Sequence, residues 1–154
     1  MKPYCTFVSK ERRIDLGQYY LYTENKFTEN SISLWKNDEG NAAAVLIAEP
    51  GIKNACLVTG EIVDEKGKAT SEITIKSEFQ KFASTYTGSN WIPEPRPFQP
   101  PKPPVGNRSL SADVIWGADI EERLMTESDG HLIQPLWITV SVSKNAVPGF
   151  YKGK

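Results

Sequence analysis

The stretch Leu136-Trp137-Ile138-Thr139-Val140-Ser141-Val142-Ser143 carries the clearest structural signal in this sequence of 154 residues. Aliphatic side chains occupy every second position, and tryptophan, threonine and serine fill the positions between them. Because successive side chains of a β-strand point to opposite faces, this period of two predicts a strand at residues 136–143. Residues 144–149, Lys-Asn-Ala-Val-Pro-Gly, have the composition of a turn, and residues 150–154 are expected to begin another strand.

Segments upstream of that strand predict more β-structure. Residues 73–82 place Ile75 and Phe79 on one face and Gln80 on the other, as expected of a half-buried strand. An uninterrupted apolar run at residues 43–48 predicts a strand that is covered on both faces. Shorter apolar or strand-like segments lie at residues 31–35, 54–63 and 111–116, with turn chemistry at residues 37–40 and 64–68.

Three other segments complete the expected organisation. Residues 93–104 contain seven prolines, which lack the N–H that a sheet interior requires, and so predict a long extended loop. This loop is expected to be a stiff surface crossover, with a partner ligand or an interdomain strap as alternatives. Residues 118–125 predict one short helix, because Ile120 and Leu124 are four positions apart. Residues 1–30 have weak periodicity and form an N-terminal segment with one or two short strands.

Together these segments predict an all-β fold. Several short strands, regular turn signals and one short helix indicate a β-sandwich, of immunoglobulin-like or galactose-binding-like type. The length fits a single domain over residues 1–154 that is large enough to bury a core of its own.

The composition argues against several classes of partner. The net charge is −1, and the basic and acidic residues are mixed along the chain, so no nucleic-acid partner is expected. No apolar run approaches the roughly 18 to 20 residues of a membrane span. With two cysteines and one histidine, neither a metal site nor a cofactor is expected. Cys5 and Cys56 could form a disulfide or remain free thiols, and the sequence leaves both alternatives open.

Residues 134–153 carry information beyond the fold class. Their sequence, QPLWITVSVSKNAVPGFYKG, closely resembles the end of the N-terminal β-sandwich domain of glycoside hydrolase family 123 and related large bacterial enzymes. In the P-G-x-Y-x-G turn of this stretch, Pro148 fixes φ and Gly149 is expected to supply a backbone shape that other residues resist. Tyr151 is expected to pack where the chain re-enters the sheet. Weaker similarities at residues 34–39 (LWKNDE) and 110–115 (LSADVI) extend the resemblance over residues 31–154.

The resemblance implies a non-catalytic accessory domain from the front of a larger, secreted bacterial glycoside hydrolase that acts on N-acetylhexosaminides. In the family a catalytic (β/α)-barrel follows, and it carries an adjacent Asp–Glu pair that supports hydrolysis assisted by the acetamido group of the substrate. No such region occurs in this sequence, so no catalytic residue is carried over, and the implied partner is the downstream domain of the same polypeptide. The implied location is secreted, periplasmic or at the cell surface, although no signal peptide is visible here.

The acidic residues and the histidine are not expected to catalyse a reaction. Adjacent acids occur at residues 38–39, 64–65 and 121–122, in turns or on the expected helix. Glycoside hydrolysis needs two carboxyl groups about 5 to 9.5 Å apart that flank one bond, so these pairs are expected to be solvated charges. Glu39 and Asp113, which match family positions, are expected to anchor loops through hydrogen bonds. His131 is expected to lie in a loop.

A glycan is a further candidate partner, because sugar rings stack on exposed aromatic side chains. The candidate ligand-binding residues are Trp91, Trp116, Tyr86 and Asn90. The alternative for both tryptophans is that they cap the core or face the missing catalytic domain, and Trp137 is expected to serve in core or interdomain packing. Two rival functions stay open: an autonomous carbohydrate-binding module, and a surface interaction domain without a glycan role that uses the Pro-rich loop.

Overall fold

The computed structural model describes residues 2–10, 14, 26–52, 54–86, 108–117, 119–120, 126–128 and 130–154. These residues form ten strands and no helix, so the predicted all-β class is confirmed for them. The strands are β1 (Tyr4–Val8), β2 (Asp38–Ala48), β3 (Ala55–Cys56), β4 (Val63–Asp64), β5 (Ile73–Tyr86), β6 (Arg108–Gly117), β7 (Asp119–Ile120), β8 (Thr126–Ser128), β9 (His131–Val142) and β10 (Tyr151–Lys152).

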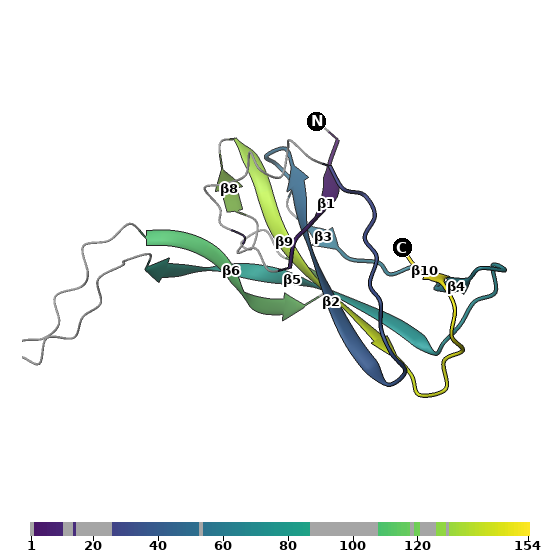
Figure 1. The fold of residues 1–154 in the computed structure, drawn as a ribbon. Coiled ribbons are helices and arrows are strands. Elements are labelled where there is room, and N and C mark those ends of the chain that lie inside the picture. Colours follow the sequence, from purple (N-terminus) through teal and green to yellow (C-terminus); the bar gives the residue numbers. More distant parts are fainter. Residues whose placement is uncertain are drawn as a thin grey trace, which may run out of the picture.

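One antiparallel sheet of six strands organises the domain (Figure 1). Its strand order is β1-β2-β9-β5-β6, and β8 pairs with the beginning of β9. Two small antiparallel ribbons, β10–β4 and β3–β7, complete the structure. Beyond the body of the sheet, β5 and β6 continue together as a projecting two-stranded ribbon.

The two strands with the clearest sequence signals lie at the centre of this sheet. β2 pairs with β9 along its whole length, from Asp38 opposite Val142 to Ala48 opposite Leu132. Five of the six residues in the apolar run 43–48 are buried, which confirms that this strand is covered on both faces. A central strand with neighbours on both edges and packing on both faces explains why the run has no polar alternation.

Different clusters cover the two faces of the sheet. On one face Val45, Ile47 and Ile133 are fully buried, and Ile14 packs against them from the N-terminal segment. Trp137 is partly buried against the same cluster, which confirms its role in core packing. On the other face the core consists of Ala44, Phe79 and Leu136, and Ala55 and Leu57 pack onto it from the segment around β3.

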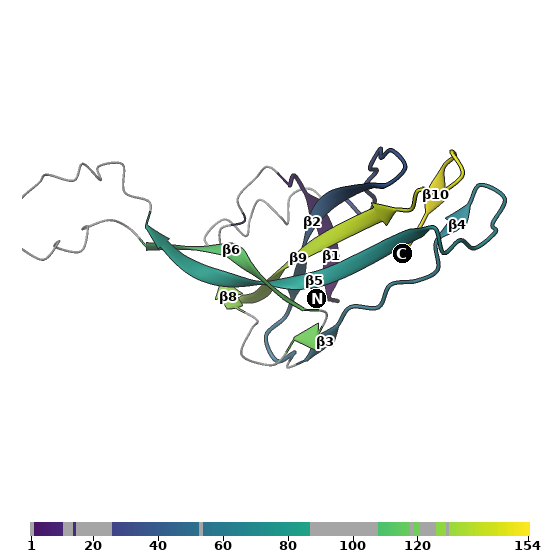
Figure 2. The same ribbon diagram turned by 90° about the horizontal axis from the view of Figure 1, so that it is seen from below.

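The second layer of the fold is made of short ribbons and connecting chain. Figure 2 shows β3 and the chain that leads from it to β4 running along one side of the long strands. The arrangement is consistent with the expected sandwich, but the layer opposite the large sheet contains strands of only two residues among the described segments.

The strand expected at residues 31–35 is absent from the structure, which corrects the sequence-based prediction. This segment has no strand pairing, and β2 begins instead at Asp38, inside the residues expected to form a turn. The segment is held by side-chain packing, because a Cβ built on Gly40 would lie 2.6 Å from Leu34 Cδ2 and 2.9 Å from Ile32 Cγ2. The missing side chain of Gly40 therefore lets Ile32 and Leu34 pack directly over β2.

Two further predictions were wrong in part. Within residues 54–63 the chain forms a strand at Ala55–Cys56 and another from Val63, but residues 57–62 between them are not part of a strand. Asp119–Ile120, expected in the helix, instead pairs with β3 as strand β7. A short helix is marginal without tertiary support, so a partner strand outweighs the helical spacing here. Residues 118 and 121–125 of the expected helix, and all of the Pro-rich loop at residues 93–104, lie outside the described residues.

Two bulges lie on β6, where it pairs with β5. The register shifts between Phe79 and Gln80 and again between Lys81 and Phe82, and each shift leaves an extra residue, Trp116 or Asp113, on β6. The alternation of β5 is therefore kept, and Phe79 and Gln80 are buried on opposite faces of a sheet that is covered on both. The backbone carbonyl oxygen of Gln80 accepts a hydrogen bond from Gln134 Nε2.

Candidate functional site

The candidate site lies at one end of the large sheet, where three strand ends coincide. Val142, at the end of β9, pairs with Asp38 at the start of β2 and with Ile73 at the start of β5. The loop at residues 64–72 precedes β5, and the turn at residues 143–150 follows β9. These two loops therefore meet beside one another.

The loop at residues 64–72 is built around one carboxylate. Asp64 Oδ1 accepts hydrogen bonds from the backbone N–H of Lys66 at 2.9 Å and of Lys68 at 2.8 Å. Gly67 adopts a φ of 77°, in the left-handed region that favours glycine. The backbone N–H of Asp64 also donates to the Lys68 carbonyl at 2.9 Å, so this loop is a closed hairpin as the sequence predicts.

The turn after β9 is fixed to this loop by Ser143 and Glu72. The Ser143 backbone N–H donates to the Glu72 carbonyl at 2.8 Å, and Ser143 Oγ donates to the Glu72 carboxylate. Ser143 Oγ also accepts a hydrogen bond from the Asn145 N–H at 3.0 Å. Ala146 is buried, which anchors the middle of the turn. The two loops consequently form one rigid surface.

The P-G-x-Y-x-G segment closes this surface, but its glycines act differently from expectation. Tyr151 is half-buried and its hydroxyl donates to the Val147 carbonyl at 2.6 Å, which ties the turn to β10. Gly149 has no positive φ, and a Cβ there would meet Tyr151 Cε2 only at 3.9 Å. The tighter surroundings are those of Gly153, where a Cβ would lie 2.6 Å from Ile75 Cδ1, the end of a flexible side chain, and 3.3 Å from Ile62 Cγ1.

A groove of about 490 Å³ separates the loop at residues 64–72 from residues 147–151. Three carboxylates line it, those of Asp64, Glu65 and Glu72. Two of them have structural roles, since Asp64 closes the hairpin and Glu72 accepts a hydrogen bond from the Ser143 hydroxyl.

The groove is lined by exposed apolar side chains that the sequence analysis missed. The exposed fraction is 70% for Val147 and 78% for Phe150, and Trp35, in the chain before β2 at the same end of the sheet, is 84% exposed. Val147 and Phe150 flank Pro148 and Gly149 in a segment that the sequence identifies simply as a turn. Two large apolar residues in an otherwise polar turn are the signal that could have found this surface.

The predicted sugar-binding residues are not tested by this structure. Trp91 and Asn90 lie outside the described residues. Tyr86 lies opposite Arg108 at the tip of the β5–β6 ribbon, whereas Trp116 precedes Gly117, the partner of Phe79. The seven steps along β5 from Phe79 to Tyr86 span about 23 Å at roughly 3.3 Å per residue, so the described backbone does not bring Tyr86 and Trp116 together. All four residues remain predictions.

The other polar residues singled out in the sequence have structural surroundings. Glu39 lies in β2, where its Oε1 accepts a hydrogen bond from Ser141 Oγ at 2.6 Å, so it joins two strands and does not anchor a loop. Asp113 lies in β6. His131 is the first residue of β9 and pairs with Ser128, which corrects its expected loop position. Among the described residues no group of three His, Cys, Asp or Glu side chains could hold a metal ion.

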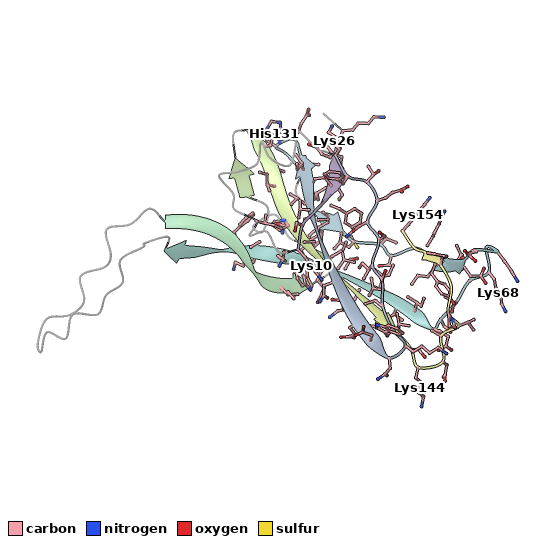
Figure 3. The ribbon with its side chains drawn as sticks, viewed as in Figure 1. Lys10, Lys26, Lys68, His131, Lys144 and Lys154 are labelled. Carbon is pink, nitrogen blue, oxygen red and sulfur yellow. The ribbon has the colours of Figure 1, made fainter. Side chains whose placement is uncertain are left out.

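The labelled lysines are spread over the domain. Figure 3 shows Lys68 beside β4, Lys144 at the turn after β9, and Lys154 beyond β10, well apart from Lys144. His131 and Lys26 lie at the end of the domain opposite Lys144, and Lys26 Nζ lies 4.1 Å from the centre of the Tyr4 ring. In the part of the chain that the structure describes, no helix is long and apolar enough to cross a membrane.

Cys5 in β1 and Cys56 in β3 both lie at the surface, and no disulfide joins them. Partial burial of the Cys5 thiol raises its pKa above the ordinary value, because loss of hydration disfavours the thiolate. Cys56 Sγ contacts the Leu57 carbonyl at 3.8 Å. The disulfide alternative is therefore not realised in this structure.

The raised pKa of Cys5 predicts a pH dependence of both reactivity and stability. In a Cys56→Ser variant, the rate of alkylation of Cys5 should reach its midpoint at a higher pH in the folded protein than in guanidinium chloride. Because the folded state disfavours the thiolate, the protonated Cys5 thiol makes its full contribution to the free energy of unfolding below the ordinary thiol pKa. This contribution is lost as the pH rises through the pKa of Cys5 in the folded protein. A folded midpoint at or below the unfolded one would contradict this environment for Cys5.

These observations define the chain first as an all-β domain built on one antiparallel sheet. It belongs to the family described as the glycoside hydrolase 123 N-terminal domain, which residues 18–154 match. No curated protein matches the sequence. The N-terminal-domain resemblance recognised in the final twenty residues is thereby confirmed.

A solved structure with the same fold is that of a family 123 glycoside hydrolase from Clostridium perfringens, described in terms of glycolipid glycan hydrolysis. The TM-score is 0.68 at 20% sequence identity, and the match covers 99% of this chain and 24% of that one. The chain thus spans about a quarter of the length of that enzyme.

Proposed function

We propose that this chain is a non-catalytic accessory domain at the N-terminus of a glycoside hydrolase, where it supports a catalytic barrel that follows in the same polypeptide. The observation that carries the proposal is the family match over residues 18–154, nearly the whole chain. The fold supports it, because a solved family 123 enzyme devotes about a quarter of its length to the same architecture.

The hydrogen bonds of the acidic side chains also support a non-catalytic role. Asp64 closes a hairpin, Glu72 binds the turn after β9, and Glu39 bonds to Ser141 across two strands. Each carboxylate stabilises the backbone or a neighbouring strand, as acids in a scaffold do.

For the parent enzyme we propose hydrolysis of N-acetylhexosaminides and a location outside the cytoplasm. The substrate class follows from the resemblance of residues 134–153 to family 123. The Clostridium perfringens relative, whose reported subject is glycolipid glycan hydrolysis, supports a glycan as the substrate.

The proposal is tested by assaying this chain and the complete polypeptide side by side on chromogenic N-acetylhexosaminides. We expect turnover by the complete polypeptide and none above buffer by residues 1–154. Hydrolysis by the isolated chain would overturn the non-catalytic role. Glycan affinity of the isolated chain that disappears in Trp91→Ala would instead establish the rival function, an autonomous carbohydrate-binding module.

A further inference from the structure

One end of the domain gathers half of the exposed large apolar side chains of the described residues. There are six such side chains, and three of them, Trp35, Val147 and Phe150, belong to the segment before β2 and to the turn after β9, which meet where Asp38 pairs with Val142. The other three, Phe27, Val58 and Ile115, lie elsewhere in the chain. Single exposed apolar residues are ordinary, but a concentration of them marks an interaction surface.

The core of this surface is preformed. The turn that carries Val147 and Phe150 is held by the hydrogen bond from Tyr151 to the Val147 carbonyl and by the bonds of Ser143 to Glu72. A partner that binds here does not have to order the loops first, which lowers the entropic cost of association.

The rim of the surface is polar and carries both signs of charge. Lys66 and Lys68 line the groove on the hairpin side together with Asp64, Glu65 and Glu72, and Lys144 lies at the base of the turn. Apolar side chains surrounded by exposed charges are the usual composition of a protein–protein interface with a dry centre.

The position of the last residues favours one occupant. Lys154 follows Phe150 by four residues, and its carbonyl oxygen accepts a hydrogen bond from the Gly60 N–H at 2.6 Å, which fixes the position of the last residues. A domain that continues from Lys154 would be tethered beside the apolar surface at a high effective concentration, so weak contacts would suffice to hold it. The solved relative has about three quarters of its chain outside the matched region.

We propose that the surface formed by Trp35, Val147 and Phe150 is the docking face for the domain that follows Lys154 in the same polypeptide. This inference rests on the proposed function, because it takes that domain to exist. The docked domain is expected to present an apolar patch with a polar rim that carries both signs of charge.

Hydrogen exchange in the complete polypeptide tests the docking face. In the wild type, we expect the amides of residues 144–151 to exchange about tenfold or more slowly than in a Val147→Asp/Phe150→Asp double variant. Exchange should also rise on one patch of the following domain. The matched control is Phe27→Asp, an equally simple change of an exposed apolar residue, which should leave both segments unchanged.

The outcomes separate docking from the proposed function. Unchanged β2 exchange shows that the double variant folds, and Trp35→Ser provides a second, independent perturbation of the same face. If neither variant alters exchange in the following domain, the docking face is wrong, even where the polypeptide hydrolyses N-acetylhexosaminides. If exchange changes as expected while that activity is absent, the docking face holds and the proposed function fails.

Discussion

Replacing Phe79 with alanine is expected to lower the free energy of unfolding by about 3 to 5 kcal/mol. Phe79 is fully buried and forms the core of one face of the sheet with Ala44 and Leu136. Its removal would leave a cavity beside a β-bulge, where the backbone already departs from regular pairing. Since small domains have a total stability of about 5 to 15 kcal/mol, this is a large fraction.

Denaturation by urea, followed by tryptophan fluorescence, measures this effect. Phe27→Ala is the matched control, because the Phe27 side chain is 59% exposed and its loss is expected to change stability by about 0.5 kcal/mol or less. Equal losses for the two variants would show that Phe79 does not form the core described here.

The second large effect is expected for Gly153→Val, with a loss of about 1 to 3 kcal/mol. A Cβ at Gly153 would lie 2.6 Å from Ile75 Cδ1 and 3.3 Å from Ile62 Cγ1, and valine adds two more methyl groups. A rotation of the Ile75 side chain can relieve part of this overlap, and the overlap that remains with Ile62 and with the added methyl groups is expected to weaken the packing of the short β10–β4 ribbon.

Gly149→Ala, in the same motif, is the control for Gly153→Val. The added Cβ would meet Tyr151 Cε2 at 3.9 Å, an ordinary van der Waals contact, so we expect a change of about 0.5 kcal/mol or less. Thermal unfolding of both variants measures the difference. A greater loss of stability for Gly149→Ala than for Gly153→Val would show that Gly149 has the special backbone role, as the sequence alone predicts.

The strands that could be predicted from the sequence are those whose burial is visible in the local pattern. The apolar run at residues 43–48 and the alternation at residues 136–143 became the central pair β2 and β9. Residues 31–35 have a similar apolar content, but Gly40 allows Ile32 and Leu34 to pack through side chains without pairing. That choice depends on a contact between segments, which no local pattern contains.

The same limit applies to the helix and to the candidate site. Asp119–Ile120 forms a strand because Ala55–Cys56 is available to pair with it, a partner more than sixty positions away. Trp35 was expected within a strand, and its exposure follows from the path of the chain before β2. The motif at residues 148–153 was identified correctly, but the sequence could not show which of its glycines contacts Ile75.

The central claim, that this domain supports a catalytic domain without taking part in catalysis, is tested most directly by deleting residues 1–154 from the complete polypeptide. The measurement is the half-life of hydrolase activity at elevated temperature, together with the KM for a chromogenic N-acetylhexosaminide. The account predicts a several-fold shorter half-life with a nearly unchanged KM, because the deletion exposes the docking patch of the catalytic domain. An unchanged half-life would contradict the account. So would a loss of activity that is restored when residues 1–154 are added as a separate chain, if the restoration occurs through KM alone.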